Sequence, residues 1–351
     1  MNICVCSKFR LKKKIGSGSF GEIYLGEQIS NGELVAIKLE PSQSKQPLLF
    51  HETKIYKRLS ASIGIPEVKW SGIEGDYNVI VMELLGDSLG TIFETHGKKF
   101  SLKTVLLIAD QLLQRIEFIH NKGLLHRDIK PENFVVGSGI KSNIIYVIDF
   151  GISSDYLIPN TNNHIEHATG RQLTGTARYA SIRNHLGNEP SRRDDLESIA
   201  YLLIYFLTGT LPWLGIKAQS ATEKYEKIAK KKINTPIDTI CNGIPLEFQT
   251  FLHETRRLEF ADKPNYSLYR EIFRNLFIRE GFVYDSVYDW TKLEDIHDLK
   301  SNPNNRRRNS FTKMSTPLIG EPSPTRIIRR VKMPQMIAIP IIKHSRKAAV
   351  L

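Results

Sequence analysis

Four polar side chains are spaced so that together they could handle a phosphate group. Asp128 and Lys130 lie in the run His126-Arg-Asp-Ile-Lys-Pro-Glu-Asn133, and Asp149 opens an Asp-Phe-Gly triplet 16 residues after Asn133. A carboxylate at Asp128 can orient a hydroxyl group or accept its proton, and the oxygens of Asn133 and Asp149 are of the kind that Mg²⁺ prefers. Lys130 can neutralise a γ-phosphate. The pattern predicts phosphoryl transfer from ATP, with Asp128 and Lys130 catalytic and Asn133 and Asp149 as metal ligands.

A glycine-rich loop near the N-terminus is a candidate phosphate cradle. Gly16-Ser17-Gly18-Ser19-Phe20-Gly21 would allow the backbone N–H groups to approach phosphates closely. Such a loop alone is weak evidence, because it also occurs in dinucleotide-binding folds and in simple hairpins. Here alternating apolar residues on both sides predict strand, loop and strand, whereas a dinucleotide fold would continue into a helix. The order excludes a nucleotide-binding dehydrogenase.

Lys38 and Glu52 complete the set of candidate catalytic residues. Lys38 ends Val35-Ala36-Ile37-Lys38, 17 residues beyond Gly21. In a strand Ala36 and Lys38 share a face, so that Ala36 leaves room for an adenine ring while Lys38 reaches the α- and β-phosphates. Glu52 lies 14 residues further on, in a segment near 47–60 with the apolar spacing of a helix. It is the natural partner to hold Lys38 in position.

The elements that must carry these residues fall into two regions. Residues 9–85 are predicted to be mostly strands with one helix, and the last strand ends at Gly86-Asp87-Ser88, which we interpret as a hinge. Residues 88–290 are predicted to be mostly helical. One helix starts after Ser101 and ends at Gly123, and Ser191-x-x-Asp194 is a capping box before a helix that is apolar nearly all round. The fold class is therefore α+β and bilobal.

The predicted domain spans 9–295, with a small β-rich lobe at about 9–84, a hinge at 83–87 and a larger helical lobe at 88–295. Residues 296–351 are predicted to be a basic, disordered tail. The net charge is +12, but 301–351 hold 11 Lys or Arg and one acid, which leaves +2 for 1–300. A domain with so little net charge is not expected to carry a dedicated nucleic-acid site.

These motifs resemble protein kinases, and a second set resembles casein kinase I in particular. Where most kinases have Ala-Pro-Glu, this chain has LTGTARYASIRNHLGNEPSRRDDLES (173–198). The resemblance extends from about Phe9 to Trp290 and includes PEVKWSG (66–72), ELLGDSLG (83–90), LPWLGIKA (211–218) and KYEKI (224–228). It implies a monomeric Ser/Thr kinase that uses MgATP. It also implies protein substrates with a phosphate or an acidic residue about three positions before the target.

The resemblance also assigns further site residues. Arg178, Lys224 and the backbone N–H of Gly215 match the anion-binding residues of the family, and Arg127 with Arg171 matches a second basic cluster. Thr176 is expected to hydrogen-bond the catalytic loop. The nucleotide pocket beyond the glycines and Lys38 is expected to consist of Ile15, Ser17, Ser19, Phe20, Ile23, Ala36, Met82, Glu83, Leu85, Val135 and Ile148.

Departures from the family concern mainly the anion sites. Ser154 stands where the family commonly has lysine, and Ala221 with Thr222 stands where it often has two basic residues. Dependence on a priming phosphate is therefore expected to be shifted. Asp87 replaces a usual hinge proline. The alternative function is a catalytically inactive scaffold of the same fold, but Lys38, Asp128 and Asp149, which inactive relatives usually lose, are all present.

Three cysteines, Cys4, Cys6 and Cys241, cannot all pair within one chain, which favours a reducing compartment, cytoplasmic and/or nuclear. Cys4-x-Cys6 permits a metal or lipid-attachment site, but a frayed chain end is the favoured interpretation. Lys230-Lys231-Lys232 and Arg306-Arg307-Arg308 match nuclear-import patches or simply solvated surface. The segment 327–343 mixes cations with apolar residues. It could contact an acidic membrane or fold onto the predicted domain, and a solvated, disordered tail is an equal alternative.

Overall fold

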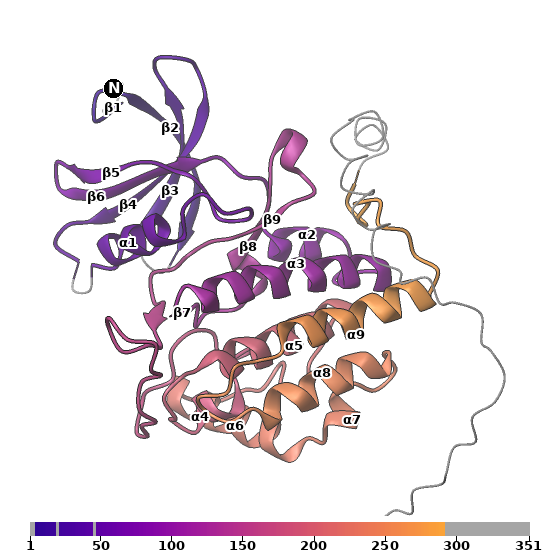
Figure 1. The fold of residues 1–351 in the computed structure, drawn as a ribbon. Coiled ribbons are helices and arrows are strands. Elements are labelled where there is room, and N and C mark those ends of the chain that lie inside the picture. Colours follow the sequence, from indigo (N-terminus) through magenta and orange to yellow (C-terminus); the bar gives the residue numbers. More distant parts are fainter. Residues whose placement is uncertain (1–3, 19–20, 45–46, 292–351) are drawn as a thin grey trace, which may run out of the picture. The chain divides into compact units, whose positions relative to one another are not determined.

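The computed structural model describes residues 4–18, 21–44 and 47–291. The predicted tail at 296–351 lies outside these residues. The N-terminal region is an antiparallel six-stranded sheet in the order β1-β2-β3-β4-β6-β5 (Figure 1). Its strands are β1 (Cys4–Val5), β2 (Phe9–Gly18), β3 (Gly21–Gln28), β4 (Leu34–Pro41), β5 (Val68–Glu74) and β6 (Tyr77–Glu83).

Strand β4 shows why this sheet forms as the alternation predicts. Val35 and Ile37 are fully buried on one face with Val79 and Val81 of β6. Ala36 and Lys38 take the intervening positions on the other face. The helix predicted near 47–60 is α1 (Leu49–Leu59), which packs against β5 and β6. One face of β4 therefore packs in the hydrophobic core, and the other face carries the candidate site residues Ala36 and Lys38.

The first residues of the sheet correct one prediction. Cys4–Val5 was expected to be a frayed end, but it forms β1 and pairs with β2. Val5 is only 2% exposed and packs against Phe9 and the valines of β4 and β6. Val5 directly precedes the turn at residues 6–8, and its burial accompanies the extension of the sheet by one strand.

The C-terminal region is mainly helical. It consists of α2 (Leu89–Thr95), α3 (Leu102–Asn121), α4 (Ile182–His185), α5 (Arg192–Thr208), α6 (Ala221–Asn234), α7 (Ile237–Ile240), α8 (Leu246–Arg257) and α9 (Tyr266–Arg279). Short strands pair as β7 (Leu124–Leu125) with β10 (Ser154–Asp155) and β8 (Phe134–Val136) with β9 (Ile145–Val147), and the 3₁₀ turns are Pro131–Asn133 and Gly139–Lys141. This bilobal α+β arrangement is the predicted fold class.

The predicted helix boundaries follow from local chemistry. The Ser101 hydroxyl accepts the Thr104 N–H at 3.2 Å at the start of α3, and Gly123 has a positive φ of 76° just past its end. At α5 the Asp194 carboxylate accepts the Ser191 N–H at 2.7 Å. None of the described helices is long and apolar enough to cross a membrane.

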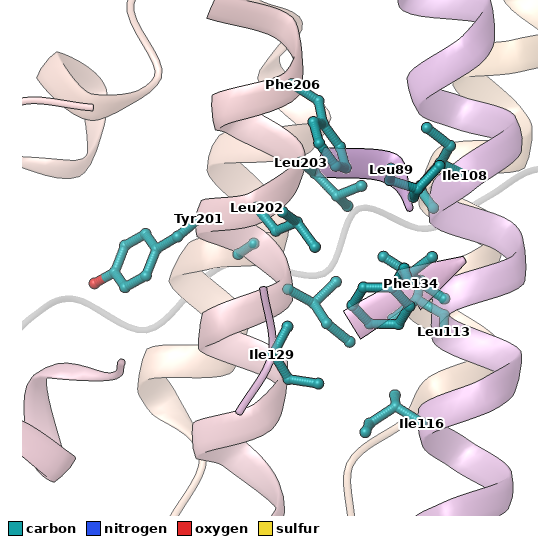
Figure 2. Packing of buried hydrophobic residues seen from close by; sticks show 14 of the residues in the cluster. Leu89, Ile108, Leu113, Ile116, Ile129, Phe134, Tyr201, Leu202, Leu203 and Phe206 are labelled. Atoms are coloured by element: carbon teal, nitrogen blue, oxygen red, sulfur yellow. The ribbon is translucent and has the colours of Figure 1, made fainter. Parts of the chain in front are cut away.

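The core between α3 and α5 holds the loop that carries Asp128. Helix α5 is buried on every side from Arg193 to Leu207, as its apolar sequence predicts. Figure 2 shows Ile129 and Phe134 among the side chains of these two helices, including Leu113 and Leu203. Since Ile129 and Phe134 flank the segment 130–133, the core fixes both ends of that segment.

The prediction that Lys230-Lys231-Lys232 forms an exposed patch is wrong for Lys232. Lys230 and Lys231 of α6 are exposed, but Lys232 is 0% exposed. Helical geometry turns each residue by 100°, so the third lysine of the run faces the protein interior. Arg306-Arg307-Arg308 lies outside the described residues.

Candidate active site

A cavity of about 1230 Å³ lies between the sheet and the helical region. Its lining includes Lys38, Asn133 and Asp149. It also contains most of the predicted nucleotide pocket, namely Ile15, Gly16, Ser17, Ile23, Ala36, Met82, Glu83, Leu85, Val135 and Ile148. Gly18 and Gly21 lie beside it rather than in its lining, and Ser19 and Phe20 are outside the described residues.

The glycine loop has the predicted strand on each side. Gly18 at the end of β2 is paired with Gly21 at the start of β3. A Cβ atom on Gly21 would lie 2.3 Å from the carbonyl oxygen of Leu39, which is far inside van der Waals contact. Glycine is therefore required at this position by the close approach of β3 to β4.

Lys38 lies at the centre of a buried ionic cluster. Its Nζ donates to Glu52 Oε2 at 2.7 Å and to Asp149 Oδ1 at 3.3 Å. Burial disfavours the charged lysine, but the two carboxylates outweigh that effect and raise the pKa of Lys38 to about 12. Glu52 is 2% exposed, and burial raises its pKa against the attraction of Lys38. The ammonium group is therefore held charged, with its position fixed by two segments distant in sequence.

Glu40 determines where the helix carrying Glu52 lies. This carboxylate is 1% exposed and accepts the backbone N–H groups of Leu48 at 2.9 Å and Leu49 at 3.2 Å. Asn78 Nδ2 also donates to it at 3.2 Å. The residue preceding α1, Leu48, offers no side-chain acceptor, so Glu40 satisfies the positive N-terminal end of α1. Strand β4 thus holds α1 at two points, through Glu40 and through Lys38.

Asp128 is surrounded by donors within the predicted catalytic loop. Lys130 Nζ donates to its Oδ2 at 2.6 Å, and Thr176 Oγ1 donates to its Oδ1 at 2.9 Å. The Asn133 amide donates to the Asp128 carbonyl at 2.8 Å, which leaves the amide oxygen as the remaining ligand atom of Asn133. The expected bond from Thr176 to the catalytic loop is confirmed. Asp128, Lys130 and Asn133 therefore form one hydrogen-bonded unit beside the cavity.

The position of Asp149 is fixed by its backbone conformation and its backbone N–H bond as well as by the contact of its side chain with Lys38. Its φ is +67°, a conformation that non-glycine residues rarely adopt, and its N–H donates to the Tyr56 hydroxyl at 3.2 Å. Burial opposes ionisation of Asp149, yet Lys38 and Lys130 hold its pKa below the usual value. The oxygens of Asp149 and Asn133 thus offer one charged and one neutral ligand, a donor set that suits Mg²⁺.

Comparison with known families agrees with this arrangement. The protein kinase domain matches residues 9–267, nearly three quarters of the chain. The chain belongs to the protein kinase family. Protein kinase domains use ATP and a divalent metal, so the cavity lined by the predicted nucleotide residues is the candidate nucleotide cleft.

The three residues predicted to form the first anion cluster lie in the same cavity as the predicted nucleotide residues. Arg178, Gly215 and Lys224 all line it. The Arg178 guanidinium lies over the rings of Tyr179 and Tyr205, 5.7 and 5.6 Å from their centroids. Lys224 is exposed on α6. Gly215 has a positive φ of 75°, and no atom lies within 4 Å of the position that a Cβ atom would take there. The structure therefore brings the three residues into the lining of the same cavity.

The second cluster of the kinase has other partners. Arg127 Nη2 donates to Thr174 Oγ1 at 3.0 Å, and burial together with the nearby Arg171 charge lowers the pKa of Arg127 against the attraction of acidic neighbours. Arg171 forms an ion pair with Glu189. Neither arginine is among the described residues that line the cavity. An anion at this cluster would have to compete with Glu189.

Sequence reasoning missed three residues that position the kinase site. Glu40 caps α1, Tyr56 accepts the Asp149 N–H, and Asp195 accepts the N–H groups of His126 at 2.8 Å and Arg127 at 2.9 Å. The sequence held a signal for two of them. Glu40 lies on the same strand face as Ala36 and Lys38. Asp194 already completes the capping box of α5, so the adjacent Asp195 is an additional carboxylate that could serve another purpose.

Proposed function

We propose that this protein is an active Ser/Thr kinase of casein kinase I type. It transfers the γ-phosphoryl group of MgATP to Ser or Thr hydroxyls of acidic or pre-phosphorylated proteins. The observation that carries the proposal is the single cavity that is lined both by Lys38, Asn133 and Asp149 and by Arg178, Gly215 and Lys224. A substrate bound across it would place a target hydroxyl near Asp128 and an upstream phosphate on Arg178.

In the proposed reaction each residue acts through a contact described above. Asp128 orients the substrate hydroxyl and takes its proton as the oxygen–phosphorus bond forms and the bond to ADP breaks. Lys130, 2.6 Å from Asp128, offsets the charge of the γ-phosphate. Lys38, fixed by Glu52, donates to the α- and β-phosphates. Asn133 and Asp149 would hold Mg²⁺, which would neutralise part of the charge on the phosphates.

The alternative is an inactive scaffold with the same fold. The connected hydrogen bonds among Lys38, Glu52 and Asp149, and among Asp128, Lys130 and Asn133, favour the enzyme. A scaffold would not need the Thr176 bond to Asp128 or the depressed pKa of Asp149.

The remaining parts of the proposal concern partners and location. We propose a monomer with protein substrates and no dedicated nucleic-acid site, since residues 1–300 carry a net charge of only +2. We place it in the cytoplasm and/or the nucleus on the basis of its cysteine content. Membrane contact through 327–343 is a secondary proposal.

The test measures initial rates with MgATP on two peptides that differ only by a phosphoserine three residues before the target serine. Arg178→Ala should remove the preference for the primed peptide, a loss of roughly 10- to 100-fold, because a hydrogen bond to a charged group contributes on the order of 1.5–3 kcal/mol. Lys230→Ala, which removes an exposed charge elsewhere on α6, is the matched control and should keep the preference.

Three outcomes separate the hypotheses. A primed preference lost in Arg178→Ala and retained in Lys230→Ala supports the proposal. Turnover by wild type no higher than that of Asp128→Asn on either peptide would replace it with the scaffold. Equal turnover of both peptides would retain the kinase and reject the anion-guided substrate choice. Replacing the target serine by threonine and by tyrosine tests the hydroxyl class in the same assay.

A further inference from the structure

Lys232 is a buried cation that the proposed chemistry does not use. It lies on α6, is 0% exposed, and is not part of the cavity lining. A lysine is almost never fully buried unless its ammonium group is satisfied by partners. The identity of those partners therefore indicates what the residue does.

The Lys232 ammonium is satisfied by backbone carbonyls and aromatic rings. Its Nζ donates to the carbonyl oxygens of Ala177 at 2.9 Å and Ala180 at 2.5 Å. It also lies 4.9 Å from the ring centroid of Tyr201 and 5.0 Å from that of Trp213. In the described part of the chain, its hydrogen bonds go to these carbonyls rather than to a carboxylate.

The two carbonyls flank Arg178. The turn from Ala177 to Ala180 is held further by Trp213, whose Nε1 donates to the Arg178 carbonyl at 2.7 Å, and by His185, whose Nε2 lies 3.1 Å from the Ala177 carbonyl. Every carbonyl of this turn except that of Tyr179 thus has a side-chain donor from α4, α6 or the segment before α6. These donors bind backbone only, so they fix the path of the chain and not the side chain of Arg178 itself.

The direction of the pKa shift does not alter this role. Burial lowers the pKa of Lys232 well below its usual value, against the attraction of Glu197. A neutral amine still carries two N–H groups, which is the number that the two carbonyls require.

We propose that Lys232 is a positioning residue for substrate choice, because it clamps the 177–180 turn so that Arg178 faces the cleft. The proposal rests on the function proposed above and deepens it: Arg178 would contact the substrate anion, and Lys232 would act through Arg178. Release of the clamp would let the turn move and separate Arg178 from Lys224 and Gly215. It would disturb the preference for an upstream phosphate more than the binding of ATP, whose predicted residues lie on the sheet and on the segments of Asn133 and Asp149.

The test compares wild type, Lys232→Met and Lys231→Met. Methionine is close to lysine in length but donates no hydrogen bond, and Lys231 is the exposed neighbour that removes the same charge from the same helix. Binding of a fluorescent phosphoserine peptide and of its unphosphorylated twin is measured by anisotropy, and kcat/KM is measured for the same pair. We expect the primed-to-unprimed ratio to fall about tenfold in Lys232→Met and to stay within twofold of wild type in Lys231→Met. The KM for ATP should change less than twofold in both variants.

A general loss of folded protein would lower the apparent kcat/KM for both peptides equally and leave their ratio unchanged. The ratio therefore separates an effect on positioning from an effect on stability. A ratio in Lys232→Met equal to that of wild type overturns the inference. If wild type itself shows no preference for the primed peptide, the anion-guided function fails first and the inference fails with it. Should Lys232→Met not fold, Trp213→Phe tests the same turn. It removes the donor to the Arg178 carbonyl together with part of the ring against which Lys232 lies, and an unchanged ratio would likewise overturn the clamp.

Discussion

The cleft around Lys38 and the turn around Lys232 each take a lysine out of solvent but surround it with different acceptors. Lys38 meets two carboxylates, which raise its pKa to about 12 in spite of burial. Lys232 meets two carbonyls and two rings, and burial lowers its pKa. Burial is common to both, so the difference comes from the charge of the acceptors.

The two environments suit different tasks. The side chain of Lys38 is 11% exposed and lines the cavity, so its ammonium can reach a phosphate while remaining fixed by Glu52. Lys232 has no exposed surface and donates to the backbone of one turn. In the proposed function, Lys38 therefore handles charge on the nucleotide, and Lys232 holds the turn that presents Arg178.

The largest expected effect is that of Lys38→Met on catalysis. Loss of the phosphate donor should lower kcat/KM on the order of 10²–10³-fold in the MgATP assay, since the donor acts in a buried site. A Lys38→Met/Glu52→Gln double variant should regain any stability lost by leaving Glu52 without its cation, but none of the activity. Activity of the single variant within tenfold of wild type would contradict the assigned role.

The next effect concerns His185, which shares the Ala177 carbonyl with Lys232. Burial and the Lys232 charge lower the pKa of His185 from 6.5 to about 4. Between these values the unfolded chain binds a proton that the folded chain does not, so the free energy of unfolding falls as pH falls from 6.5 to 4. The contribution is at most about 3 kcal/mol. Urea titrations of His185→Gln should show this part of the pH dependence removed.

Lys232→Met sharpens the same measurement. Without the neighbouring cation the pKa of His185 should rise toward its usual value, and the loss of stability on acidification should shrink. Asp194 acts in the opposite direction, because burial raises its pKa to about 6 and its folded form gains a proton as pH falls. Since Asp194 is unchanged in these variants, it cancels in the comparison. An equal pH dependence in wild type and Lys232→Met would show that Lys232 carries no charge that acts on His185 in this pH range.

A third effect is the stability change in Lys232→Met at neutral pH. The Ala180 carbonyl loses its side-chain donor and the Ala177 carbonyl keeps only His185, which should lower the free energy of unfolding by about 1–3 kcal/mol. The exposed Lys231→Met should change it by less than about 0.5 kcal/mol. Chemical denaturation of both proteins checks the difference. Equal stability would mean that packing against Tyr201 and Trp213, and not hydrogen bonding, accounts for the buried lysine.

The smallest expected effect is that of Glu40→Gln. The neutral side chain keeps one acceptor oxygen, but its NH2 group cannot accept the backbone N–H that the second carboxylate oxygen accepts. It also loses the charge at the N-terminus of α1, and together these changes should cost about 1–2 kcal/mol. A few-fold fall in kcat should follow, because Glu52 moves with α1. The control is Glu33→Gln, which removes an exposed carboxylate directly before β4, the strand that carries Glu40. No change in either property would show that Lys38 alone fixes the helix.

Much of the site followed from residue types and spacing. Alternation placed Ala36 and Lys38 on one face of β4, and apolar spacing gave the helix of Glu52 nearly to its ends. The Ser101 and Asp194 caps depend on neighbours within three residues, and both were confirmed in position. The errors fell on Cys4–Val5 and on Lys232, where the outcome depends on partners far along the chain.

By itself, then, the sequence determined the order of the phosphate-handling residues, the two-lobed succession of strands and helices, and the helix caps, because each depends on side chains that are close in sequence. Only the tertiary structure decided that Glu40 holds α1, that Asp195 supports the catalytic loop, and that Lys232 clamps the turn of Arg178. The physical reason is the same in all three cases. These side chains bind backbone N–H or C=O groups, which are present in nearly every residue, so no residue type in the sequence marks the partner.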